Sequence, residues 1–184
     1  KDGFYVDCGA NDGVNQSTTW YFENQLNWKG ILIEPIPSVF NELKKNRNKN
    51  NYFQNCALTN SSFERDYVDF FYNEKDTLTG TMKNKDNTLK INVIAKTFDK
   101  IIDEINYKGK IDFFSLDVEG NEFEVLEGID FNKHYIDYML IETNNFTKLE
   151  NFFSNLNYKF LKRLSNYNFL DKPEYGDYLF KKIK

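Results

Sequence analysis

Acidic side chains lie at the ends of three apolar stretches of this chain, at the points where buried strands would end. In "FYVDCGANDG", Asp7 precedes Gly9 and Gly13, while Glu34 closes the run "GILIEP" and Asp117 follows "IDFFSL". A carboxylate beside glycines suits a positively charged ligand, because the carboxylate stabilises the cation and glycine lets the backbone approach it closely. A second carboxylate at the end of the next strand can accept hydrogen bonds from both hydroxyls of a ribose.

The glycine pattern excludes the two commonest phosphate-binding loops. A dinucleotide fingerprint needs glycine at its first, third and sixth positions, but Asn11 and Val14 follow Gly9 at the third and sixth. The stretch also lacks the lysine of a P-loop. We therefore expect a ligand whose nearest part carries an amine and a sulfonium rather than a pyrophosphate.

A second acidic group follows two later apolar runs. Asp117 and Glu119 stand in "SLDVEGNE", and Glu142 and Asn144 stand in "IETNN". Adjacent parallel strands would bring both sets to one edge, where they could act as a general base with hydrogen-bonding helpers. Alternatively, Asp117, Glu142 and Asn144 could bind a divalent metal ion. We favour the metal-free reading because no metal-binding spacing motif is present.

Several side chains have a plainer interpretation. Asp117 or Glu119 could cap a helix that begins near Gly120, and we expect capping to explain one of them. His134, the single histidine, lies between a predicted helix and strand, where we expect a surface role. The basic clusters "KKNRNK" and "FKKIK" are expected to be solvated ends of a helix and of the chain.

The elements that must position these residues alternate between strand and helix. Apolar runs predict strands over 3–8, 30–34, 52–58, 110–118 and 136–143, with helices over 20–26, 37–47, 98–105, 120–129 and 146–156. This alternation predicts a parallel sheet with right-handed crossovers. The last two extended segments, 158–164 and 176–183, are expected to form an antiparallel pair. The aromatic alternation over 63–73 predicts a further strand, the polar stretch 74–88 a long loop, and 89–98 a returning extended segment. The aromatic side chains of 67–72 could stack on bases or sugars, but we expect them to be sheet core. Segment 66–90 is predicted to form an insertion on the acceptor side of the site.

Length and composition indicate one domain over residues 1–184, and a net charge of −4 gives no footprint for nucleic acid. No apolar run is long enough to span a membrane. Cys8 and Cys56 are expected to be reduced core thiols, which favours the cytoplasm. The chain starts at Lys1, so we expect the natural protein to extend further. The oligomeric state is not predicted.

The motifs "FYVDCGANDGVNQS", "WKGILIEPIP", "LKKNR", "CAL" and "IDFFSLDVEGNEFEVLEGIDF" together resemble the FkbM-type family of S-adenosylmethionine-dependent methyltransferases, from about Gly3 to Asn144. The resemblance implies an α/β fold, a seven-stranded Rossmann-like class I methyltransferase sandwich. Its strand order would be 3-2-1-4-5-7-6, mostly parallel with an antiparallel C-terminal strand. The cofactor would be S-adenosylmethionine.

The resemblance also implies a role for each motif. Asp7, Gly9, Asn11 and Gly13 would surround the methionine part of the cofactor, with Ser17 nearby; Glu34 would hold the ribose; Asn55, Cys56 and Ala57 would flank the adenine; and Asp117 would lie beside the methyl donor. Glu119, Glu142 and Asp117 are the candidate catalytic groups.

The expected activity is O-methylation of a hydroxyl on a sugar, glycan precursor or related small metabolite. N-methylation and phosphate-ester methylation remain alternatives, since they would use the same cofactor half. A non-catalytic module that binds S-adenosylmethionine is the alternative from another functional class.

Overall fold

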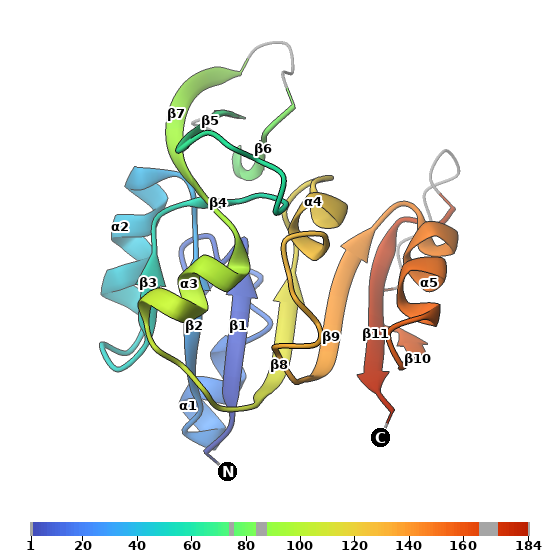
Figure 1. Ribbon diagram of the computed structural model, residues 1–184. Helices are drawn as coiled ribbons and strands as arrows, with labels where there is room; N and C mark the ends of the chain where they lie inside the picture. Colours follow the sequence, from blue (N-terminus) through green and yellow to red (C-terminus); the bar gives the residue numbers. More distant parts are fainter. Residues whose placement is uncertain (1, 74–75, 84–87, 166–172, 184) are drawn as a thin grey trace.

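Seven strands form the larger of two sheets in the computed structural model, which describes residues 2–73, 76–83, 88–165 and 173–183 (Figure 1). Their order across the sheet is β3 (Tyr52–Gln54), β2 (Lys29–Ile33), β1 (Phe4–Cys8), β8 (Ile111–Leu116), β9 (Ile136–Thr143), β11 (Gly176–Lys182) and β10 (Tyr158–Arg163). The first five are parallel, and β11 runs antiparallel to both of its neighbours. Counted along the chain, this is the expected order 3-2-1-4-5-7-6.

Helices cover both faces of this sheet. Successive side chains of each strand point to opposite faces, so each strand contributes to the packing on both. Phe4, Val6 and Cys8 of β1 belong to the larger core cluster, which α3 (Phe98–Glu104), α4 (Glu122–Leu126) and α5 (Phe146–Ser154) complete. Tyr5 points the other way and packs with residues of α1 (Trp20–Leu26) and α2 (Pro37–Asn46). The central strand β1 is therefore buried on both sides.

A second, four-stranded sheet lies beyond the carboxyl ends of β1 and β2 (Figure 1). Its order is β4 (Ala57–Leu58), β7 (Leu89–Lys96), β5 (Tyr67–Asn73) and β6 (Asp76–Thr81). The stretch 52–58, expected to be one strand, is therefore divided between the two sheets. Asn55 lies at the division, and its amide donates to the backbone oxygens of Glu34 and Pro35 at 2.8 and 3.0 Å.

The loop predicted within 66–90 is partly wrong, because β6 pairs with β5 there. Gly80 allows this pairing, since a Cβ at that position would lie 2.7 Å from the ring of Phe70. The small sheet packs on α2 through Val68, Phe70, Val93, Ile36 and Val39, so it belongs to the folded core. Residues 74–75 and 84–87 of the predicted insertion lie outside the described residues.

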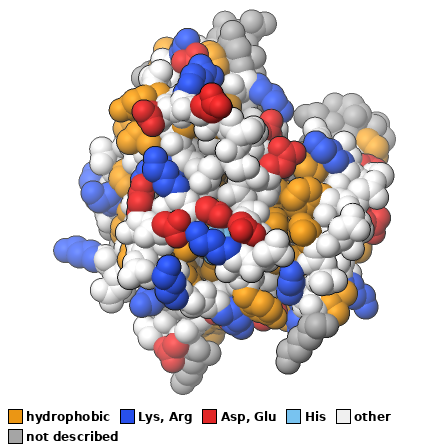
Figure 2. Space-filling view, viewed as in Figure 1, with side chains coloured by type: hydrophobic (Ala, Val, Ile, Leu, Met, Phe, Trp, Pro, Cys, Tyr) orange, Lys and Arg blue, Asp and Glu red, His pale blue; other side chains and the backbone are white. Residues whose placement is uncertain are grey.

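Acidic and basic side chains alternate on the face shown in Figure 2. Near α3, Lys133 lies 2.9 Å from Asp103 and Lys96 lies 2.6 Å from Glu104. This face therefore presents no large area of a single charge. Within the described ranges, no helix is long and apolar enough to cross a membrane.

Candidate functional site

Two pockets meet at the carboxyl ends of β1 and β8. The first, here called the Glu34 pocket, is lined by Glu34, Ile36, Cys56, Ala57, Leu58, Phe70 and Met82 among others. The second, the Glu142 pocket, is lined by Asp7, Asn15, Gln16, Ser17, Thr18, Ser115, Glu142, Ser165 and Asp177 among others. Gly9, Asn11 and Asp117 line both. A ligand that occupies both pockets would therefore pass directly over the end of β1.

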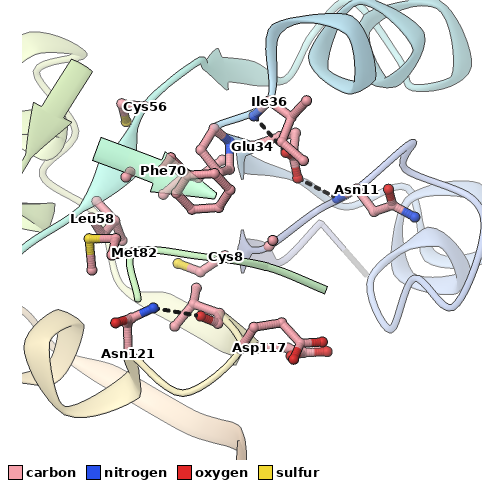
Figure 3. A pocket seen from close by; sticks show the side chains of 17 residues that line it. Cys8, Asn11, Glu34, Ile36, Cys56, Leu58, Phe70, Met82, Asp117 and Asn121 are labelled. Atoms are coloured by element: carbon pink, nitrogen blue, oxygen red, sulfur yellow. Dashed lines mark hydrogen bonds between the residues drawn. The ribbon is translucent and has the colours of Figure 1, made fainter. Parts of the chain in front are cut away.

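Glu34 is held in one orientation by two backbone N–H groups (Figure 3). Its Oε1 accepts from Ile36 at 2.8 Å, and its Oε2 accepts from Asn11 at 3.1 Å. The side chain is buried, and burial raises its pKa from the ordinary value of 4.5 to about 7. Each oxygen of a carboxylate offers two lone pairs, so both retain the capacity to accept a further hydrogen bond from a ligand.

The rest of the Glu34 pocket is mostly apolar. Cys56 and Ala57 line it, whereas Asn55 acts from behind by fixing the backbone at Glu34. Phe70 lies in β5 and Met82 directly follows β6. The sequence favoured a core role for the aromatic segment 67–72 and did not single out Met82. The signal for Phe70 was the aromatic alternation around it, which marks a half-buried strand, whereas Met82 lies in a polar stretch that gave no signal. An apolar slot next to a fixed carboxylate suits a flat base joined to a ribose.

The turn after β1 depends on glycine at two positions. Gly9 and Gly13 both have φ +81°, and a Cβ on Gly9 would overlap the carbonyl oxygen of Asp117. Asn11 also has a positive φ, of 46°, and its N–H donates to Glu34. The turn therefore brings the backbone close to both pockets, and Gly13 itself is buried below the surface of the turn.

Asp7 is buried at the floor of the Glu142 pocket. Its Oδ2 accepts from the hydroxyl of Thr19 at 2.5 Å and from that of Ser17 at 3.4 Å. Burial raises the pKa of Asp7, while these hydroxyls and Arg47 act in the opposite direction. Ser17 lies two residues before Thr19, the N-cap of α1, so it precedes the helix and faces the pocket.

Three carboxylates crowd together at the ends of β8 and β9. One oxygen from each of Asp117, Glu119 and Glu142 lies within 4.8 Å of the others. Asp117 opens into the cleft, yet surrounding protein and the charges of Glu142 and Glu119 raise its pKa. The hydroxyl of Tyr175 donates to Glu142, and Asn144 lines an adjoining hollow with these side chains. Such a group can accept a proton from a ligand or hold a cation.

Two of the plainer interpretations are wrong. The N-cap of α4 is Asn121, and the N–H of Gly120 donates to Glu122 at 2.8 Å, so neither Asp117 nor Glu119 takes the capping position. His134 is buried, and its ring nitrogen Nε2 lies 3.0 Å from a carboxylate oxygen of Asp99. It lines neither pocket, so its role is to pack rather than to face solvent.

The expectation that "KKNRNK" is a solvated helix end is also wrong for Arg47. This residue is only 3% exposed, and its side chain lies beneath the turn that follows β1. The physical reason is that α2 ends at Asn46 and the backbone of Arg47 becomes extended. Its side chain is thereby separated from Lys44 and Lys45, which remain exposed.

Comparison with known proteins gives a consistent result. The model of the methyltransferase FkbM domain matches residues 7–169. Among solved structures, the chain is similar to the crystal structure of methyltransferase FkbM from Methylobacillus flagellatus KT, with a TM-score of 0.59 and 15% identity. The match covers 98% of this chain and 43% of that one, so this chain spans less than half of its length. No curated protein matches. The domain match over most of the chain shows that it belongs to the FkbM methyltransferase family.

Proposed function

We propose that this protein is an S-adenosylmethionine-dependent O-methyltransferase, with a Rossmann-like class I sandwich, that acts on a hydroxyl of a sugar, glycan precursor or related small metabolite. The observation that carries the proposal is the buried Glu34 carboxylate, fixed by two N–H groups beside an apolar slot. The two free cysteines, Cys8 and Cys56, are both buried, which supports a reducing compartment such as the cytoplasm.

The residues of both pockets fit this cofactor. When bound, S-adenosylmethionine supplies a methyl group that is activated by a positive sulfur. Glu34 would accept the ribose hydroxyls, and Cys56, Ala57 and Phe70 would cover the adenine. Asp7 lies where a carboxylate can stabilise the charged amino-acid end. Because Gly9 and Asp117 line both pockets, the reacting centre would lie between them.

The lining of the Glu142 pocket disfavours an anionic acceptor. Four carboxylates line it, from Asp7, Asp117, Glu142 and Asp177. They would repel a phosphate, which disfavours the phosphate-ester alternative. A carboxylate at this edge can take the proton of a hydroxyl as the new bond forms. An amine would also fit, so paired alcohol and amine acceptors of equal size would separate O-methylation from N-methylation.

We propose a single domain in which segment 66–90 is an insertion on the acceptor side. Lys83 supports this placement, since its ammonium donates to the carbonyl of Gly120 at 2.6 Å, next to Glu119. Phe70 and Met82 of the same segment line the Glu34 pocket. The segment would therefore contribute to cofactor binding as well as to the acceptor side.

The proposal is tested by Glu34→Ala. Loss of the carboxylate leaves the ribose hydroxyls without their acceptor, so the affinity for S-adenosylmethionine should fall by about 1.5–3 kcal/mol. Isothermal titration calorimetry on the folded variant measures this change. Glu42→Ala is the matched control, because Glu42 is exposed on α2 and should leave the affinity unchanged. Unchanged affinity in Glu34→Ala would show that the ribose does not bind at Glu34. Binding without any transfer, across alcohol and amine acceptors, would favour the non-catalytic alternative.

The raised pKa of Glu34 predicts a pH dependence of stability. The pKa lies near 7 in the folded protein and near 4.5 in an unfolded chain, so the folded state favours the protonated form. Glu34 therefore contributes to the free energy of unfolding in full below pH 4.5. This contribution, about 3 kcal/mol at most, is lost as the pH rises through 7. Chemical denaturation of the ligand-free protein between pH 4.5 and 8 measures this loss. The free energy of unfolding should fall with rising pH more steeply in the unaltered protein than in Glu34→Gln. Parallel curves for the two proteins would contradict it.

A further inference from the structure

We infer that Arg47 is a positioning residue that fixes the turn over residues 13–19, and that it thereby sets the affinity for the amino-acid end of the methyl donor. The inference rests on the proposed function and extends it to a residue outside both pocket linings. It depends on the contacts of the guanidinium group, on the structure of the turn and on the distribution of charge around Asp7.

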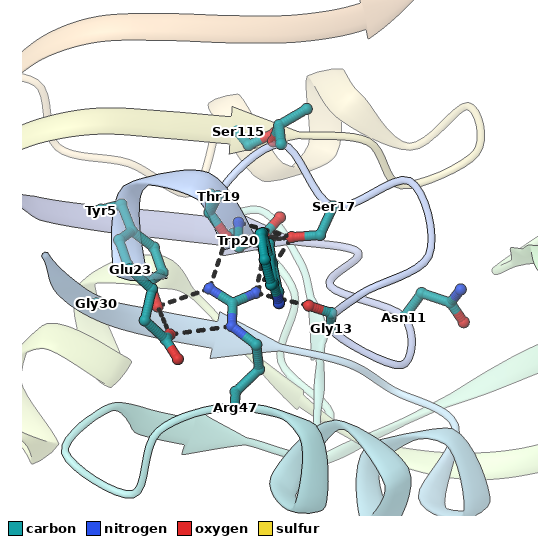
Figure 4. Close-up of polar contacts among 12 residues, drawn as sticks. Tyr5, Asn11, Gly13, Ser17, Thr19, Trp20, Glu23, Gly30, Arg47 and Ser115 are labelled. Carbon is teal, nitrogen blue, oxygen red and sulfur yellow. Dashed lines mark hydrogen bonds and ion pairs between the residues drawn. The ribbon is translucent and has the colours of Figure 1, made fainter. Parts of the chain in front are cut away.

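All five N–H groups of the guanidinium have an acceptor (Figure 4). Nη1 donates to the carbonyl oxygen of Gly13 at 3.0 Å and to the hydroxyl of Ser17 at 3.1 Å. Nη2 donates to the hydroxyl of Thr19 at 3.1 Å and to that of Tyr5 at 2.8 Å. Nε donates to Glu23 at 3.0 Å. Three of these five bonds therefore end on the turn, at both of its ends.

The middle of the turn has few other supports. Val14, Asn15 and Gln16 are exposed, so no buried side chain anchors them. Asp12 accepts from the N–H groups of Val14 and Asn15, which stabilises the bend locally but does not attach it to the sheet. Asn15, Gln16 and Ser17 line the Glu142 pocket. The position of this pocket wall is thus set by the ends of the turn. Arg47 holds both ends, while Thr18 and Thr19 also bond to Ser115 and Asp7 of the sheet, at 2.8 and 2.5 Å.

The charges around Arg47 favour a cationic group in the pocket. Glu23 pairs with Nε of Arg47. The pKa of Glu23 is lowered despite its burial, by hydrogen bonds from Tyr5, Asn48 and Asn51 and by the charge of Arg47. The guanidinium is therefore already matched by one carboxylate. Asp7 lies 4.0 Å from Nη1 as a second carboxylate, and it also faces the Glu142 pocket. Asp7 is therefore the acidic group that can interact with a cationic part of a ligand, such as the ammonium group of an amino acid.

The test compares two ligands that share the nucleoside and the sulfur. S-adenosylhomocysteine carries the amino-acid end, whereas 5′-methylthioadenosine carries only a methyl group there. In Arg47→Lys, which keeps the charge but not the five-donor fork, the affinity for S-adenosylhomocysteine should fall about tenfold or more. The affinity for 5′-methylthioadenosine should stay within about twofold, because the Glu34 pocket is unaffected. Calorimetric titration of both ligands gives the ratio.

Two controls separate positioning from general stability. Glu23→Gln removes the ion pair but leaves the bonds from Arg47 to the turn, so it should lower the melting temperature without a selective loss of S-adenosylhomocysteine binding. Lys45→Met removes an exposed charge from the last turn of α2, two residues before Arg47, and should change neither affinity. If Arg47→Lys fails to fold, Thr19→Val should give a smaller loss of the same selectivity, because it removes the Nη2 bond at the turn together with the bonds to Asp7 and Ser17.

Equal loss of both ligands, or no loss of either, would overturn the role of Arg47 while leaving the proposed function intact. Failure of the unaltered protein to bind either ligand would instead overturn the proposed function, and the role of Arg47 with it.

Discussion

Glu142→Gln is expected to lower the rate of methyl transfer by about a hundredfold or more, with little change in the affinity for S-adenosylmethionine. Glu142 accepts a hydrogen bond from Tyr175 and lies within the three-carboxylate group, at the edge of the pocket proposed for the acceptor. Glutamine keeps the shape of the side chain but cannot take a proton from a hydroxyl. Glu150→Gln, on the exposed side of α5, is the matched control and should retain full activity.

Chelation distinguishes the two mechanisms for this group. If the carboxylates act as a base, a chelator changes nothing, and Glu119→Gln should also slow transfer by about a hundredfold. If Asp117, Glu142 and Asn144 bind a divalent ion, a chelator should stop turnover and magnesium should restore it. We favour the metal-free mechanism. Full activity in both Glu119→Gln and Glu142→Gln, with and without chelator, would show that the carboxylates at the ends of β8 and β9 take no part in methyl transfer.

Gly9→Ala is expected to destabilise the protein by about 3 kcal/mol or more. Two costs add, because the backbone has φ +81° and the new Cβ would overlap the carbonyl oxygen of Asp117. To relieve the overlap, β1 and β8 would have to separate at the site itself. The melting temperature should fall by roughly 6–12 °C for a chain of this size.

Gly120→Ala is the control that separates the two costs of Gly9→Ala. Its φ is +93°, but the nearest atom to a new Cβ is the ammonium nitrogen of Lys83 at 3.6 Å. The free energy of unfolding of this variant should therefore fall only by the cost of the backbone conformation, about 1–2 kcal/mol. Equal destabilisation of the two variants would show that the contact with Asp117 is not what requires glycine at position 9.

The larger sheet could be predicted because its strands are short, apolar and separated by amphipathic helices. Parallel strands end at one edge, so Asp7, Glu34 and Asp117 could be assigned to a common region from their places after apolar runs. The structure brings them there. The chemical role of each follows from its residue type and neighbours, and it stays a proposal that the variants above would test.

Strands β5 and β7 of the small sheet could be predicted from their apolar alternation, whereas β4, β6 and the position of Arg47 could not, for two different reasons. β4 has only two residues, and β6 runs through "DTLTGT", which lacks an apolar alternation. Their strand character comes from pairing, of β4 with β7, which is distant in the sequence, and of β6 with β5. Arg47 follows two exposed lysines, and a run of charges does not reveal which member meets Glu23 and Gly13 in the fold.

The central position of β1 has a consequence for biosynthesis. Phe4 donates its N–H to Asp112, 108 residues further along, and β8 is the strand that covers this edge of β1. At ordinary translation rates, the ribosome needs about 5–20 s to make the intervening residues. Throughout that time an apolar strand has one unpaired edge, which is the kind of surface that joins other chains. Newly made chains should therefore depend on chaperones, and recombinant yield should improve when expression is slow and cool.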